Sequence, residues 1–219
     1  MTNNTPGIQE ALTEITLARG LQYLTNLDTD FERIVNQFGS PPLWERPPGF
    51  STLIRIILEQ KISLASAGAV YDRLLSLTST LTPARLLELD DSTLRRIGFS
   101  RQKMVFSRHL ARSIIEGRID LPALEKMTDD EARSELMNIK GIGPWTAEIY
   151  LLRALLRPDA WPASDLALAV AVQKIKRLPL RPSPLELESI GDGWRPWRAV
   201  AARLLWHYYL NPSAPISTG

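Results

Sequence analysis

The chain has 219 residues, of which 44% are hydrophobic and 23% charged, so it can bury a core and is not a disordered protein. It has no cysteine and only two histidines, which excludes disulfides, iron–sulfur clusters and thiol nucleophiles and argues against a histidine-rich metal site. The net charge is +2, divided between an acidic half (residues 1–94) and a basic half (residues 95–219) that would suit a polyanionic partner.

The apolar spacing is helical almost throughout, and no stretch keeps the two-residue alternation of a strand together with β-branched residues. In chain order, the pattern predicts helices over residues 8–24, 31–38, 50–77, 83–89, 91–97, 101–116, 129–137, 144–156, 166–175 and 196–210. We expect the long segment 50–77 to break into two helices near Ser63. The proline-rich segments 41–48 and 179–184 are expected to be ordered linkers, and the fold class that follows is all-α.

Residues 166–172 alternate leucine or valine with alanine and could be mistaken for a strand. We predict a helix there, because alanine favours helices and either Ser164 or Asp165 can cap the start. Basic residues follow at the expected C-terminal end, where the helix dipole favours cations, and Pro179 then stops the helix.

The most informative segment reads LMNIKGIGPWTA over residues 136–147. One helix ends, Gly141 and Gly143 flank Ile142, and a new helix begins at Pro144. Glycines permit a tight hairpin, an isoleucine between them can anchor the turn in the core, and the free amides of the next helix can bind an anion such as phosphate. The same pattern is also found in ordinary helix–turn–helix corners that end in glycine.

The longer string resembles the helix–hairpin–helix element of DNA repair glycosylases. Three further segments occur in the order seen in that superfamily: ILEQKIS (57–63), LRRIGFSRQK (94–103) and DAWPASDLAL (159–168). Within the superfamily the chain is most similar to the 3-methyladenine DNA glycosylase II, or alkylpurine DNA glycosylase, branch, which has Trp-Thr-Ala after the hairpin. The likeness covers about residues 45–210.

This resemblance implies a helix–hairpin–helix DNA glycosylase fold of two α-helical subdomains with a cleft between them. One subdomain would comprise residues 49–157, with the helix–hairpin–helix at about 136–156. The other would combine residues 1–48 with 158–219 and carry the catalytic aspartate. We expect no N-terminal β-domain of the kind found in the enterobacterial member.

Asp165 follows Pro162-Ala163-Ser164 at an expected helix start, and by its local pattern alone it is a helix cap. The resemblance aligns it with the catalytic aspartate of the superfamily. A carboxylate there could stabilise the oxocarbenium charge that develops on the deoxyribose and orient water toward C1′. An alkylated purine already carries positive charge and needs little help from a general acid.

Bifunctional members of the superfamily place a lysine in the helix after the hairpin, where it forms a Schiff base. This chain has Trp145 at that position, so we expect a hydrolase without β-lyase activity. The resemblance also implies an aromatic base pocket, with Trp206 as its tryptophan and Trp145 and Tyr150 as further candidates. Ile149 stands where the enterobacterial homologue has a tyrosine.

A flipped base leaves a gap in the duplex, and the resemblance places the residue that fills it at Lys61, where an apolar side chain would be expected. The alternative for Lys61 is a solvated surface lysine. The expected DNA contacts are Gln60, Lys61, Arg101, Lys103, Gly141, Ile142, Gly143, Trp145, Thr146, Arg195 and Arg198. The resemblance implies no cofactor beyond a monovalent cation, Na⁺ or K⁺, which the hairpin carbonyls of Ile139 and Ile142 could hold.

The function expected is therefore that of a monofunctional DNA glycosylase, which hydrolyses the N-glycosidic bond of alkylated purines, above all 3-methyladenine, in double-stranded DNA during base excision repair. Two alternatives are a non-catalytic helix–hairpin–helix module that binds DNA and a superfamily glycosylase for another damaged base. The longest apolar run is too short to span a bilayer and the N-terminus resembles no signal peptide. We expect a soluble monomer in the cytoplasm and nucleoid, or in the nucleus of a eukaryote.

Overall fold

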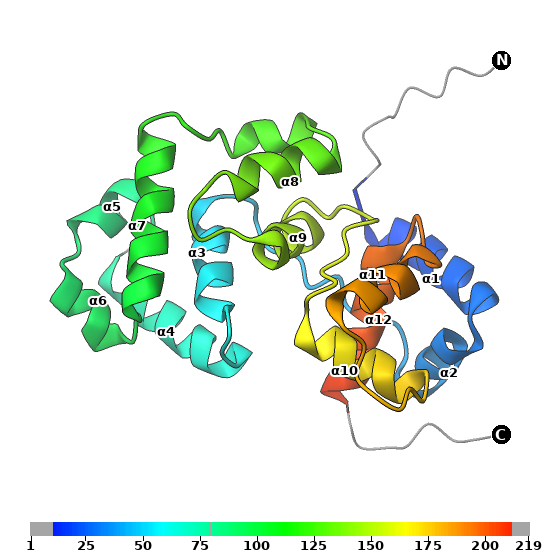
Figure 1. Ribbon diagram of the computed structural model, residues 1–219. Helices are drawn as coiled ribbons and strands as arrows, with labels where there is room; N and C mark the ends of the chain where they lie inside the picture. Colours follow the sequence, from blue (N-terminus) through cyan, green and yellow to red (C-terminus); the bar gives the residue numbers. More distant parts are fainter. Residues whose placement is uncertain (1–10, 79, 212–219) are drawn as a thin grey trace, which may run out of the picture. The chain divides into compact units, whose positions relative to one another are not determined.

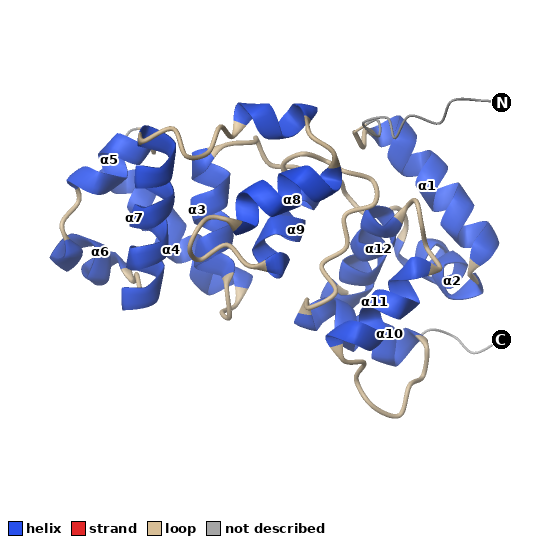
Figure 2. Cartoon of the chain, turned by 45° about the horizontal axis from the view of Figure 1, so that its top comes forward, coloured by secondary structure: helices blue, strands red, loops and turns tan. Residues whose placement is uncertain are grey.

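The computed structural model describes residues 11–78 and 80–211. Over these residues the chain forms helices joined by loops and has no β-strand (Figure 2), so the predicted all-α class is confirmed. No helix in the described part of the chain is long and apolar enough to span a membrane. The helices are α1 (Glu14–Leu27), α2 (Thr29–Phe38), α3 (Phe50–Glu59), α4 (Leu64–Leu77), α5 (Pro83–Glu88), α6 (Asp91–Ile97), α7 (Arg101–Ile115), the 3₁₀ helix η1 (Pro122–Lys126), α8 (Asp129–Met137), α9 (Pro144–Arg153), α10 (Leu166–Ile175), α11 (Pro184–Asp192) and α12 (Arg198–Leu210).

The chain divides into two compact units. Unit 1 is described over Arg46–Leu155 and holds α3 to α9. Unit 2 is described over residues 11–45 and 156–211 and holds α1, α2 and α10 to α12. The hairpin segment therefore belongs to unit 1 and Asp165 belongs to unit 2.

Unit 1 is built around α3, which packs on α4, α7 and α9, while α8 lies against α9 (Figure 1). The helix is apolar on most of its surface, and Leu53, Ile54, Ile56 and Ile57 are fully buried. The predicted break in residues 50–77 is confirmed: α3 ends at Glu59, and Ser63 caps α4 by accepting a hydrogen bond from the Ser66 amide. A helix buried all round needs such partners on several sides to cover its apolar surface.

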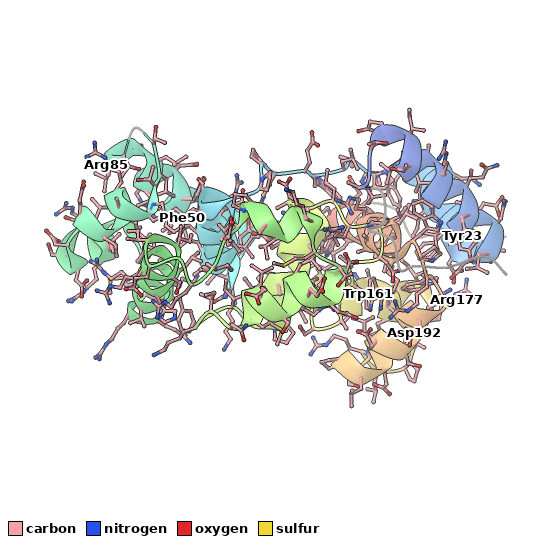
Figure 3. The ribbon with its side chains drawn as sticks, turned by 90° about the horizontal axis from the view of Figure 1, so that it is seen from above. Tyr23, Phe50, Arg85, Trp161, Arg177 and Asp192 are labelled. Atoms are coloured by element: carbon pink, nitrogen blue, oxygen red, sulfur yellow. The ribbon has the colours of Figure 1, made fainter. Side chains whose placement is uncertain are left out.

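Unit 2 is built around α12, which packs on α10, α2 and α1. On α1, Gly20 allows close approach, since a Cβ there would lie 2.8 Å from the ring of Trp197. Trp161, labelled in Figure 3, donates its indole N–H to the Leu187 carbonyl of α11 and stacks edge-on with Trp194. The helix predicted over residues 166–175 is confirmed as α10.

Several predicted boundaries need correction. The first helix starts at Glu14, after the Thr13 cap, and extends to Leu27 instead of ending at residue 24. Residues 8–10 of that prediction lie outside the described residues. Helix α9 ends at Arg153, short of 156, and α12 starts at Arg198, after Trp197, instead of at 196.

Two elements were not predicted from the sequence, η1 and α11. Helix α11 follows the second proline-rich segment and begins with a capping box between Ser183 and Glu186, with Pro184 in its first turn. The pattern Ser-x-x-Glu before an apolar position is the signal that could have identified it.

Candidate functional site

The glycine hairpin joins α8 to α9 in unit 1. Its turn is held by hydrogen bonds from Ile139 N to Leu136 O (3.1 Å) and from Ile142 N to Ile139 O (3.0 Å), and both isoleucine side chains are buried. Gly141 has φ of +95°, and a Cβ at this position would overlap the ring of Phe106. The hairpin therefore requires glycine at 141 for both its backbone conformation and its packing.

Gly143 behaves differently. Its backbone is extended, with φ −98° and ψ −178°, and a Cβ there would meet no atom within 4 Å. It caps α9 without a side-chain hydrogen bond, so no side chain of the cap covers the first-turn amides. Such a bare, exposed helix start can take an anionic oxygen, and the absence of a side chain at 143 leaves room for a close approach.

Asp165 in unit 2 is the N-cap of α10. Its Oδ1 accepts a hydrogen bond from the Leu168 amide at 3.0 Å, the usual contact of a capping carboxylate. The same oxygen accepts a second hydrogen bond from the indole Nε1 of Trp206 at 3.1 Å. These two donors fix the orientation of the carboxylate, and the residue as a whole is half-buried.

Trp206 lies on α12 and is only 6% exposed. Its ring meets Trp44 edge-on, with 6.4 Å between the ring centroids. The indole N–H points to Asp165, a contact that the sequence did not reveal. The hydrogen bond links Trp206 to the carboxylate, and its stacking on a base stays a prediction.

The family model for the HhH-GPD superfamily of base excision DNA repair proteins matches residues 54–196, a span that includes the hairpin and Asp165. The chain belongs to the HhH-GPD superfamily. The resemblance drawn from the sequence is thereby confirmed at the level of the family.

Relatives within the HhH-GPD superfamily cover most of the chain. DNA-3-methyladenine glycosylase 1 of Schizosaccharomyces pombe is 29% identical over 205 residues, 90% of this chain and 89% of that protein. DNA-3-methyladenine glycosylase 2 of Escherichia coli is 28% identical over 169 residues, 72% of this chain and 57% of that protein.

Solved structures of DNA glycosylases are also similar to this chain. The 3-methyladenine DNA glycosylase of Schizosaccharomyces pombe in complex with abasic DNA superposes with a TM-score of 0.82 and 27% identity, over 92% of this chain and all of that one. An 8-oxoguanine glycosylase/lyase of Clostridium acetobutylicum bound to duplex DNA is 13% identical, over 95% of this chain and 75% of that one, and its TM-score of 0.75 shows a shared fold alone.

Two residues expected in an HhH-GPD base pocket lie in the interior of the protein. Ile149 and Tyr150 on α9 are both buried. The Tyr150 hydroxyl accepts a hydrogen bond from the Gly49 amide at 2.8 Å, and burial raises the pKa of this tyrosine to about 12. Their contact with a flipped base stays a prediction, whereas Trp145 is partly exposed in the first turn of α9.

The arginines expected to contact phosphates differ in their exposure to solvent. Arg198 is only 6% exposed, and its guanidinium pairs with Asp159 and Glu188 at 3.0 Å each. Arg195 also pairs with Asp159, so both arginines are held in ion pairs within the protein, and their contact with phosphates stays a prediction. Arg101, at the start of α7, is exposed.

Residues near the end of α3 are held from neighbouring helices. Lys103 donates from Nζ to the Leu58 carbonyl at 2.5 Å, and burial lowers the pKa of this lysine. Gln60 donates from Nε2 to the Gly141 carbonyl and to Thr146 Oγ1, both at 2.9 Å. Lys61, the next residue, is exposed and has a left-handed backbone with φ of +59°.

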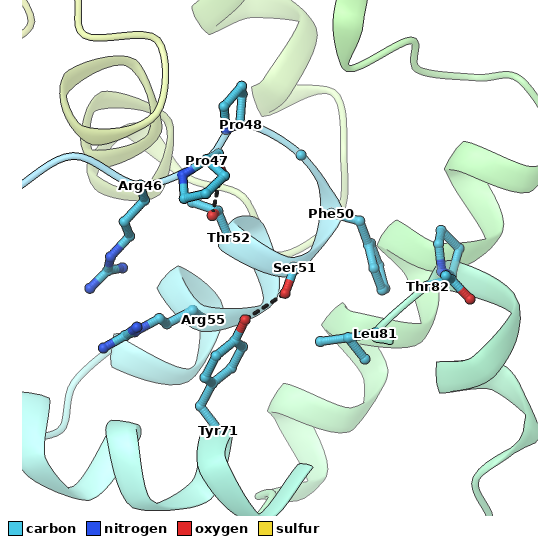
Figure 4. A pocket seen from close by; sticks show the side chains of 12 residues that line it. Arg46, Pro47, Pro48, Phe50, Ser51, Thr52, Arg55, Tyr71, Leu81 and Thr82 are labelled. Carbon is cyan, nitrogen blue, oxygen red and sulfur yellow. Dashed lines mark hydrogen bonds between the residues drawn. The ribbon is translucent and has the colours of Figure 1, made fainter. Parts of the chain in front are cut away.

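A cavity of about 420 Å³ lies at the N-terminal end of α3 within unit 1 (Figure 4). Ser51 and Tyr71 share a hydrogen bond on its wall, and Arg55 lies over the Tyr71 ring at 5.3 Å. None of the site residues expected from the sequence lines this cavity. Among the described residues there is also no group of three or more histidine, aspartate or glutamate side chains placed to hold a metal ion.

Proposed function

We propose that this chain is a monofunctional DNA glycosylase, acting as a monomer, that releases alkylated purines such as 3-methyladenine from duplex DNA by hydrolysis. The observation that carries this proposal is the carboxylate of half-buried Asp165, held through Oδ1 by two donors at the start of α10. The names of the Schizosaccharomyces pombe and Escherichia coli relatives, both DNA-3-methyladenine glycosylases, support the choice of lesion.

In the proposed reaction the bond between C1′ and the purine nitrogen breaks, and its electron pair leaves with the base. A cationic alkylpurine departs as a neutral base, so no general acid is required. Positive charge then accumulates on the deoxyribose, where the Asp165 carboxylate stabilises it. Water adds to C1′ and passes its proton to the carboxylate.

The two donors to Oδ1 serve this chemistry by fixing the plane of the carboxylate. Leu168 N holds it from the helix and Trp206 Nε1 from α12. A preorganised carboxylate does not have to reorient as the charge develops, which is the main source of electrostatic catalysis. The proposal therefore assigns Trp206 a positioning role.

The absence of lyase activity belongs to the same proposal. A Schiff base requires an amine at C1′, and the position that carries the lysine in bifunctional members holds Trp145 here. Its indole cannot attack C1′, so the reaction ends at the abasic site.

Binding of the DNA backbone is assigned to the hairpin. At the start of α9 no side chain caps the helix, so the amides near Gly143 can bind a phosphate. The exposed side chains of Arg101 and Lys61 add positive charge. A monovalent cation at the carbonyls of Ile139 and Ile142 would strengthen this contact. A carbonyl oxygen has two lone pairs, so Ile139 O can accept its hydrogen bond from Ile142 N and still face a cation.

The test is incubation of the purified chain with methylated duplex DNA, followed by chromatography of the released bases. The wild type should release 3-methyladenine, whereas Asp165→Asn should bind the same DNA and release none. A wild type that binds DNA in a salt-dependent manner without releasing any base would instead be a DNA-binding module. Release of a different damaged base would move the proposal to another lesion.

A further inference from the structure

The turn between α3 and α4, residues 60–63, carries the exposed side chains of Lys61 and Ile62. Its first residue, Gln60, does not share this exposure. Its side chain reaches the glycine hairpin, where Nε2 lies 2.9 Å from the Gly141 carbonyl oxygen and 2.9 Å from Thr146 Oγ1. These partners are 81 and 86 residues further along the chain.

The geometry of the Gln60 amide is fully determined by these contacts. A side-chain amide nitrogen has two N–H donors, and here one is directed to each acceptor. The opposite orientation of the amide would place its oxygen against the Gly141 carbonyl oxygen, which is repulsive. Gln60 therefore has one orientation in which it can hold the hairpin.

The hairpin end of this link is rigid. Gly141 is fixed by its positive φ and by the Phe106 ring packed against its α-carbon. Thr146 is 2% exposed in the first turn of α9. Because both acceptors are fixed in place, the position of the hairpin determines the position of the Gln60 side chain.

The helix end of the link is held as well. Lys103 on α7 donates to the Leu58 carbonyl at 2.5 Å, which ties down the last turn of α3. The turn 60–63 is thus attached to the hairpin through Gln60 and to α7 through the preceding residues. On the other side the turn ends at Ser63, which caps the start of α4.

We propose that Gln60 is a positioning residue that fixes the turn 60–63 relative to the glycine hairpin. The hairpin and the turn then contact one DNA duplex at a fixed distance from each other. The hairpin amides bind a phosphate, and the exposed side chains of the turn contact the base stack. This inference rests on the proposed function and deepens it. It replaces the expectation that Gln60 itself binds DNA, because both of its N–H donors are engaged within the protein.

The position of the turn relative to the hairpin matters only where a base pair must be opened. In duplex DNA the hairpin has to hold the backbone while the turn occupies the space that the extruded base leaves. In single-stranded DNA no partner strand closes that space. Loss of the link should therefore slow base release from duplex DNA far more than from a single strand.

The experiment compares Gln60→Met, which keeps the length of the side chain and removes both donors, with Thr146→Ser, which keeps the hydroxyl acceptor. Single-turnover release of 3-methyladenine is measured from a methylated oligonucleotide as duplex and as single strand. For Gln60→Met we expect about a tenfold loss on duplex, less than about a twofold loss on single strand and little change in Kd for undamaged duplex. Thr146→Ser should keep the wild-type ratio of the duplex rate to the single-strand rate.

A double-mutant cycle separates the link from a general loss of packing. Thr146→Val should lose part of the duplex rate, and Gln60→Met combined with Thr146→Val should be no slower than Gln60→Met alone. Equal losses on duplex and single strand, or no loss on either, would overturn the positioning role.

Amide hydrogen exchange gives a readout that does not depend on activity. In Gln60→Met, exchange should accelerate in the segments 60–63 and 139–143 and stay unchanged in α5 and α6. Unchanged exchange in both segments would overturn the inference even in an active enzyme. If the wild type releases no base, the proposed function fails and the exchange result alone decides whether the link exists.

Discussion

The indole Nε1 of Trp206 donates a hydrogen bond to Oδ1 of Asp165 across 3.1 Å, and 41 residues separate the two along the chain. Helix α10 supplies the carboxylate and the buried helix α12 supplies the donor. Two elements that pack on each other thus set the orientation of one oxygen atom.

Trp206→Phe tests this relationship, because it keeps an aromatic ring and removes the N–H. We expect single-turnover base release to fall about tenfold, the effect of losing one hydrogen bond to a charged group, with Kd for abasic-site DNA nearly unchanged. Trp44→Phe is the matched control, since Trp44 packs edge-on against Trp206 and should lose less than about twofold. Equal losses in the two variants would assign Trp206 to packing alone.

The two hairpin glycines should respond differently to alanine. Gly141→Ala combines a strained positive φ with overlap on Phe106, and should lower the free energy of unfolding by about 2–4 kcal/mol. Gly143→Ala meets no atom and keeps an ordinary extended backbone, so its stability should stay within about 0.5 kcal/mol of the wild type. Urea denaturation measures both.

Gly143→Ala should nonetheless weaken DNA binding, since the added methyl group occupies the exposed surface in front of the α9 amides. Fluorescence anisotropy with a labelled duplex measures this effect. An unchanged Kd for Gly143→Ala would show that the phosphate lies elsewhere.

The substitution Lys61→Gly should raise the stability of the protein and lower its activity. Glycine adopts the φ of +59° without strain, so the free energy of unfolding should rise by roughly 0.5–1 kcal/mol. Base release from duplex should fall, because the Lys61 side chain no longer helps to fill the gap. A variant that is more stable and equally active would exclude Lys61 from base extrusion.

Arg198 and Arg101 form a contrasting pair. Arg198→Met leaves the buried Asp159 carboxylate with one fewer partner and should destabilise the protein by about 3 kcal/mol. Arg101→Gln should leave stability unchanged and lower the slope of log Kd against log salt by about 1. A normal salt slope in Arg101→Gln would remove it from the DNA contacts.

Borohydride trapping tests the assignment as a monofunctional enzyme. Incubation with abasic-site duplex and sodium borohydride should give no covalent complex, because Trp145 has no amine. Trp145→Lys provides the comparison for the trapping assay. A high yield of trapped wild-type protein would mean that another amine reaches C1′.

The sequence alone determined the elements that depend on a few neighbouring residues. The break at Ser63, the hairpin around Ile142 and the cap at Asp165 all follow from contacts within about four positions, which a sequence displays directly. The start of α11 at Ser183 carried the same kind of signal in its capping box.

Only the tertiary structure decided which side chains are available for function. Arg198 is held in a buried ion pair with Asp159, Tyr150 is packed under the Gly49 amide, Trp206 binds Asp165 and Gln60 binds the hairpin. These partners lie between 39 and 101 residues apart. Such contacts arise from how whole helices pack, and no local pattern encodes the partner of a side chain that far along the chain.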